Sequence, residues 1–315
     1  MSTILTKSHS FNAHISLFLV NSLYAAGHII AKGVMPNYLS PTTFIFFRIL
    51  GATLLFWTIK LFLPKEKIEK KDYKRFLVCA LFGITVNQLF FFHGLNLSSS
   101  INSGIIMTTN PILVVVLGYF IIKEKITGLK LFGVALGAIG AILLTVAGNT
   151  AKGESFLGDL FLLINSISYA IYLLIAKPLM QKYSPITVMT YVFTIGSIYM
   201  LLYPPTYIDT FSTDFSSIPR EIWLKIMYII IGVTFFTYLL TIYALKYLSP
   251  SVSSSYIYFQ PMLVIVFAYI FYFLNVSEDY RNTITLPKIG YMLLIFLGVW
   301  ITSYATKRNK KSLKV

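Results

Sequence analysis

One cationic side chain, Arg48, lies inside a long apolar segment, seven residues after Pro41. If this segment is a helix that crosses a bilayer, Arg48 lies about 10 Å inside it. A charged group at that depth is costly in free energy, so it faces the protein interior or a wet cavity. A guanidinium there can bind a substrate carboxylate through two parallel hydrogen bonds. It can equally tie helices together through backbone carbonyls, or extend toward the interface, and both interpretations stay open.

Polar side chains also recur on one face of the first apolar segment. Asn21, Tyr24 and His28 are three and four residues apart, which places them on the same side of a helix. A similar stripe in the second half of the chain includes Asn165 and Tyr169. An amide, a phenol and an imidazole can line a cavity, but they can also hydrogen-bond neighbouring helices.

Three further apolar segments add amides, imidazoles and tyrosines to these candidates. Tyrosines inside a span can stack on an apolar substrate while their hydroxyls orient it, or they can belong to an interfacial belt. We expect a substrate cavity lined by Asn21, Tyr24, His28, Arg48, Asn87, His93, Ser103, Asn110, Asn165, Tyr169, Tyr256, Tyr258 and Gln260.

Residue combinations typical of catalysis are missing from the sequence. It has no paired carboxylate in an apolar segment, no Cys/His cluster with metal-ligand spacing and no phosphate-binding glycine loop. A membrane-embedded enzyme that uses His28 and His93 is the nearest alternative, but nothing else completes such a site. We therefore expect no enzyme, no catalytic residue, no metal and no cofactor.

The composition is that of a membrane protein. Hydrophobic residues make up 57% of the 315 residues and charged residues 12%, against about 25% charged in soluble domains. Crossing the hydrocarbon core takes roughly 20 apolar residues in a helix, and the apolar runs are too continuous for barrel strands. We predict an all-α membrane protein with ten transmembrane helices, at about 14–34, 41–63, 75–96, 99–122, 129–148, 157–179, 185–205, 222–247, 250–275 and 286–305.

The net charge of +15 is concentrated in short loops between these spans, which points to membrane orientation and not to nucleic acid binding. Nineteen basic residues lie on the side of the N-terminus, six on the other side, and Arg48 within the membrane. The positive-inside rule then predicts that both termini lie on the cytoplasmic side of the membrane. We expect this membrane to be a bacterial-type inner membrane.

The chain contains an internal repeat. Asn110-Pro111 begins a ten-residue segment that recurs at Gln260-Pro261, 150 residues later, with five identical positions. The repeat divides the chain into halves at 1–150 and 151–315, each with five predicted spans. Because five is odd, the second half enters the membrane from the opposite side, as two inverted five-helix repeats. We expect Pro111 and Pro261 to kink their helices.

Several of these residues resemble the pattern of the EamA-domain transporters of the drug/metabolite transporter (DMT) superfamily. The matches are Lys32 with Ser40-Pro41 and Arg48, then Gly94-Leu95 with Ser98 and Pro111, then Glu124 with Gly133 and Gly140. The second half departs from the pattern, with no arginine matching Arg48 and with Leu274 in place of Glu124. The resemblance implies a ten-helix inner-membrane carrier with a central cavity, commonly an exporter of amino acids or related metabolites.

We therefore predict a carrier of a small amphipathic molecule that works by alternating access. An amino acid or related metabolite is the first expectation, because Arg48 accompanies tyrosines and amides; a lipophilic cation is the alternative, and a channel is a weaker one. The expected partners are the small-molecule substrate and the lipid bilayer, without nucleic acid. The chain is a monomer or a homodimer, since Gly133, Gly137 and Gly140 can serve helix packing or a dimer face.

Overall fold

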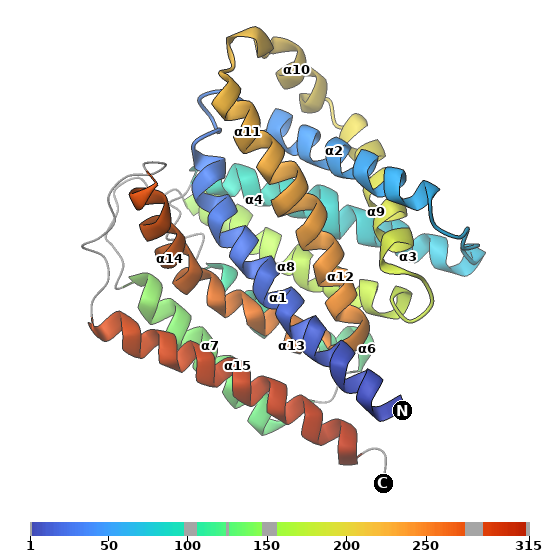
Figure 1. Cartoon of the computed structure of the whole chain (residues 1–315), viewed down its shortest axis with the longest axis vertical. Coiled ribbons are helices and arrows are strands. Elements are labelled where there is room, and N and C mark those ends of the chain that lie inside the picture. The colour runs from blue at the N-terminus through green and yellow to red at the C-terminus, as the bar shows by residue number, and fades with distance from the viewer. Residues whose placement is uncertain (1, 98–105, 124–125, 147–155, 275–285, 313–315) are drawn as a thin grey trace.

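A computed structural model of the chain describes residues 2–97, 106–123, 126–146, 156–274 and 286–312. Within these ranges the chain forms helices and turns and no strand, which confirms the all-α prediction (Figure 1). The α-helices are α1 Ser2–Lys32, α2 Pro41–Leu61, α3 Tyr73–Ala80, α4 Val86–Leu97, α6 Asn110–Ile122, α7 Gly128–Val146, α8 Phe156–Leu179, α9 Pro185–Leu201, α10 Pro205–Ser212, α11 Arg220–Tyr228, α12 Thr237–Tyr247, α13 Pro250–Ser255, α14 Gln260–Phe273 and α15 Leu286–Ser312. Short 3-10 or π segments are η1 Lys70–Asp72, η2 Leu81–Thr85, η3 Phe215–Ser217, η4 Ile229–Phe236 and η5 Tyr256–Phe259.

By length and composition, six helical segments among the described residues can cross a bilayer: His9–Ala31, Pro41–Leu61, Lys70–Leu97, Phe156–Leu179, Arg220–Tyr247 and Pro250–Phe273. Helices α9 and α10 would form a seventh, but they meet at a bend of 79°. The predicted span 185–205 therefore runs too far, because Pro204 and Pro205 end the helix that began at Pro185. The described parts of the remaining predicted spans hold shorter apolar helices, so ten crossings remain a prediction.

Three Ser-Pro pairs start helices in the same way. Ser40, Ser184 and Ser249 each adopt an extended backbone, and each hydroxyl accepts a hydrogen bond from the backbone N–H three residues later. The following proline occupies the first helical turn, where its missing N–H costs nothing. The sequence thus sets the first residue of α2, α9 and α13 locally.

The regular α-helix is interrupted just before each of the two repeated prolines. The 3-10 segment η5 separates α13 from α14, and Pro261 follows in the first turn of α14. A turn precedes α6, and Pro111 again lies in the first turn. Two other long spans each contain a π-helical segment, η2 and η4, and such segments are often found at functional sites.

Helices from the two halves pack in reciprocal pairs. Helix α1 packs against α12 and α14, and α8 packs against α4 and α6 in the matching arrangement. Helix α2 packs against α9, and α7 lies alongside α15 at one edge of the molecule (Figure 1). The first helix of each half therefore contacts the third and fourth predicted spans of the other half.

Glycines let α7 and its neighbours approach closely. A Cβ atom added at Gly133 would lie 2.7 Å from the backbone nitrogen of Thr302 in α15, and one at Gly137 would lie 2.5 Å from the ring of Tyr258. Real Cβ atoms do not approach other atoms so closely. These glycines are therefore used for packing within the chain, and their face is already covered.

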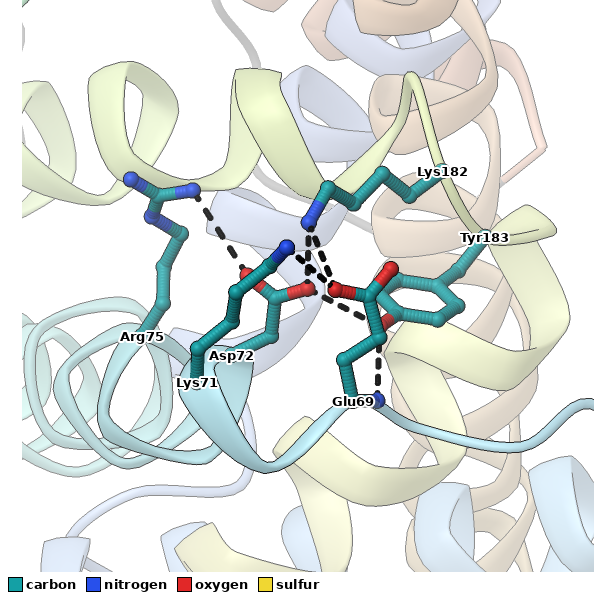
Figure 2. Close-up of polar contacts among 6 residues, drawn as sticks. All are labelled: Glu69, Lys71, Asp72, Arg75, Lys182 and Tyr183. Atoms are coloured by element: carbon teal, nitrogen blue, oxygen red, sulfur yellow. Dashed lines mark hydrogen bonds and ion pairs between the residues drawn. The ribbon is translucent and has the colours of Figure 1, made fainter.

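The segment between α2 and α3 is fastened to the turn between α8 and α9 by a polar cluster (Figure 2). The Asp72 carboxylate accepts hydrogen bonds from Lys182 Nζ at 2.8 Å and from the Tyr183 hydroxyl at 2.9 Å. Its hydrogen bond raises the pKa of the Lys182 ammonium above the ordinary value. Burial raises the pKa of the Tyr183 phenol, whose oxygen also accepts from the backbone N–H of Glu69. A loop of one half is thus held against a loop of the other.

Candidate functional site

A central cavity of about 90 Å³ lies between the helices of the two halves. Nine of the thirteen predicted site residues line it: Asn21, Tyr24, His28, Arg48, Asn87, Asn110, Asn165, Tyr169 and Gln260. The helical stripes predicted for the first and sixth spans therefore face each other across one space.

Four predicted residues are not placed in this cavity. The Tyr258 ring lies on Gly137, and its hydroxyl donates to the Val134 carbonyl at 3.0 Å. The Tyr256 hydroxyl pairs with His14 Nδ1 at 2.7 Å, and His93 Nε2 pairs with the Thr42 hydroxyl at 3.2 Å. Ser103 lies outside the described residues. For Tyr256 and Tyr258 the reason is helix rotation, because η5 turns their side chains toward other helices.

Arg48 is buried, with 2% of its surface exposed, so its side chain does not extend to the protein surface. Its Nε donates to the Thr234 hydroxyl of η4 at 2.9 Å, and its guanidinium carbon lies 4.4 Å from the centre of the Phe92 ring. One terminal nitrogen, Nη1, has no hydrogen-bond partner. Arg48 thus links two helices and still offers a free cationic donor beside the cavity.

The two amides that precede the repeated prolines make equivalent contacts. Asn110 Nδ2 donates to the Ser166 carbonyl of α8 at 2.8 Å. Gln260 Nε2 donates to the Asn21 side-chain oxygen of α1 at 2.9 Å. Each amide therefore joins the fourth span of its own half to the first span of the other half, and each lies at the cavity wall.

A further polar pair, Gln88 and Tyr238, lines the cavity but was not among the predicted site residues. Gln88 Nε2 donates to the Tyr238 hydroxyl at 2.7 Å, and that hydroxyl donates to the Gly83 carbonyl of η2 at 2.9 Å. The two residues are 150 positions apart, the same spacing as the two prolines. Applying the repeat spacing to every polar residue of a span would have revealed the pair.

Several buried polar atoms at the cavity have no hydrogen-bond partner. They are Arg48 Nη1, Gln88 Oε1, Asn110 Oδ1, Thr241 Oγ1 and Ser253 Oγ. Burying a polar atom without a partner costs about 1–3 kcal/mol, so each of these atoms favours a polar ligand or water. The set combines a cationic donor with two amide acceptors and two hydroxyls.

The remaining cavity wall is apolar or aromatic. Phe91, Phe92, Val233 and Ile257 are among the lining residues, and the ring of His28 lies 5.3 Å from that of Phe91, tilted by 36°. Among the described lining residues Arg48 is the only permanent charge, and none is a carboxylate. Across the described parts of the chain, no group of three His, Cys, Asp or Glu residues could hold a metal ion. The site is therefore suited to a small molecule with an anionic end and an apolar part.

The chain matches the EamA-like transporter family over residues 12–146 and 156–304. An "Uncharacterized transporter" from Archaeoglobus fulgidus is 26% identical over 297 residues, which cover 92% of this chain and 96% of that protein. The "Uncharacterized transporter YyaM" from Bacillus subtilis is 24% identical over 266 residues, covering 82% of this chain and 85% of the relative. One solved crystal structure aligns with a TM-score of 0.68 at 13% identity, covering 96% of this chain and 98% of that chain; it supports the fold alone.

Proposed function

The chain belongs to the EamA-like transporter family, and we propose that it carries a small metabolite with a carboxylate, in the first instance an amino acid, across the membrane. The observation that carries this proposal is the buried guanidinium of Arg48, whose Nη1 is unpaired beside a cavity with no carboxylate among its described lining residues. A substrate carboxylate would accept hydrogen bonds there. A substrate ammonium would donate to the free amide oxygens of Gln88 and Asn110.

The charge of the cavity is the reason for ranking a lipophilic cation second. Two unit charges of the same sign at 5 Å repel by about 3 kcal/mol at an effective dielectric constant of 20. No carboxylate among the described lining residues offsets Arg48.

Transport by alternating access of two inverted five-helix repeats, 1–150 and 151–315, is part of the proposal. The reciprocal packing of α1 on α12 and α14, and of α8 on α4 and α6, supports it. The hydrogen bond between Gln88 and Tyr238, at equivalent repeat positions, supports a pseudo-two-fold axis that passes beside the cavity. In such carriers one repeat rocks against the other around a site near the midplane.

We place the protein in a bacterial-type inner membrane with both termini cytoplasmic. The distribution of basic residues supports this orientation. The start of α1 and the end of α15 lie toward the same end of the molecule (Figure 1), as an even number of crossings requires.

Counterflow in proteoliposomes tests the proposed substrate. Liposomes preloaded with one unlabelled amino acid are mixed with its labelled form, and protein-free liposomes serve as the control. We expect saturable uptake of at least one amino acid through the protein. Saturable exchange of a quaternary ammonium dye, with no exchange of any amino acid, would reverse the ranking of the two substrate classes.

A further inference from the structure

A second hollow lies at the beginning of α3 and shares no lining residue with the central cavity. It is an open groove of about 550 Å³ between α3 and the end of α8. Four basic side chains line it, those of Lys71, Lys74, Arg75 and Lys182. We name it the basic groove.

Two of these cations are already engaged by carboxylates. Lys71 pairs with Glu69 at 2.6 Å, and Lys182 pairs with Asp72 at 2.8 Å. In Figure 2 the side chains of Lys71 and Lys182 lie close to these two carboxylates, which also hold the loop in place. This pairing leaves the groove with two basic residues in excess.

The excess is carried by Lys74 and Arg75. The nearest paired carboxylate oxygen to Arg75, that of Asp72, is 3.9 Å away, a distance that leaves most of its donors available. Both side chains are exposed, and no carboxylate in the described part of the chain forms an ion pair with Lys74. Both side chains line the groove, and a guanidinium and an ammonium are groups that bind the oxygens of a phosphate.

The inner wall of the groove is apolar. Val78 of α3 and Ile175 of α8 are half-buried lining residues. Further along the same span, Leu77 and Leu81 are 44% and 37% exposed, a surface suited to lipid chains. Cations at a helix end followed by apolar side chains along the span match a molecule that has a phosphate at one end and a hydrocarbon chain at the other.

We propose that the basic groove binds an anionic phospholipid. The phosphate lies on Lys74 and Arg75, and the first part of an acyl chain lies along Val78 and Ile175. Basic pockets between membrane helices are suited to such headgroups, because surface electrostatics and apolar burial act together there. Free inorganic phosphate would use the cations but gain nothing from the apolar wall.

Thermal unfolding of the purified full-length protein in detergent tests this proposal. The protein is titrated separately with phosphatidylglycerol, phosphatidylcholine and inorganic phosphate. The test variant is Lys74→Gln with Arg75→Gln. The control variant, Lys65→Gln with Lys246→Gln, removes the same charge at two exposed positions outside the groove.

Phosphatidylglycerol should raise the Tm of the wild-type and control proteins in a saturable way. The test variant should need at least a tenfold higher lipid concentration for half the shift, with an unchanged Tm in detergent alone, because both altered side chains are exposed. An equal response of test variant and wild type would overturn the site. Equal shifts with inorganic phosphate or phosphatidylcholine would overturn an anionic lipid as the ligand. The Tm and the lipid concentration that gives half of its shift are both measured without the transported substrate, so this test does not depend on the proposed function.

Discussion

Replacement of Arg48 by glutamine separates a substrate-binding role from a structural one. The substitution removes the only permanent charge among the described cavity-lining residues and keeps a hydrogen-bonding side chain of similar length. A carboxylate held by Arg48 loses a charge-assisted hydrogen bond worth about 1.5–3 kcal/mol. At about 1.4 kcal/mol per tenfold change, the Kd for the substrate should rise about 10- to 150-fold.

The effect on stability should be small or favourable. The variant loses the bond to Thr234 and the contact with Phe92, worth about 1.5–3 and 0.5–2 kcal/mol respectively. It also relieves the burial of a guanidinium whose Nη1 is unpaired, and the desolvation of a buried ion costs several kcal/mol. The relief offsets the losses, so we expect a Tm equal to or above that of the wild type.

Binding of the labelled amino acid that exchanges in counterflow, together with thermal unfolding in detergent, checks both expectations. Thr234→Val is the matched control, because it removes a partner of Arg48 and keeps the charge. The control should unfold at a lower temperature and bind the substrate with a smaller loss. A clear fall in the Tm of Arg48→Gln with an unchanged Kd would show that the arginine is structural.

Two further predictions concern packing and the loop cluster. Gly137→Ala should lower the Tm by overpacking worth about 1–3 kcal/mol, because its Cβ would lie 2.5 Å from an aromatic ring, whereas Gly128→Ala, with no atom within 4 Å of its Cβ, should leave the Tm unchanged. In the polar cluster that joins the two loops, the hydrogen bond with Asp72 raises the pKa of Lys182. The stabilisation from this pair is complete below about pH 10.4, the pKa of lysine in the unfolded chain. It is lost as the pH rises through the higher pKa of Lys182 in the folded protein. The Tm difference between wild type and Asp72→Asn should therefore shrink above that pH, and a difference that stays constant up to about pH 11 would contradict the pairing.

The membrane class and the positions of the six long apolar helices in the described residues could be predicted because they depend on local chemistry. Long apolar runs must satisfy their backbone hydrogen bonds internally, and helices do so within one segment. Helix starts at Ser40, Ser184 and Ser249 depend on a side chain three residues from its partner. The end of α9 was missed because apolar residues continue past Leu201, while the chain bends by 79° between α9 and α10, where Pro204 and Pro205 lie.

The residues that line the cavity could be predicted where the polar residues of one helix share a face. Asn21, Tyr24 and His28 line the cavity together, as their spacing requires. The orientation of η5 could not be predicted, because a short 3-10 stretch changes the rotation per residue and turns Tyr258 toward Gly137.

By itself the sequence determined that this is a helical membrane protein with a repeated proline motif and one deeply placed arginine. Only the tertiary structure decided which polar residues face the cavity, including the pair Gln88 and Tyr238. The physical reason is that lipid chains are as apolar as a packed interior. Hydropathy therefore locates a membrane helix but does not distinguish its buried face from its lipid-facing one. Contacts between helices that are far apart in the sequence determine which face is buried.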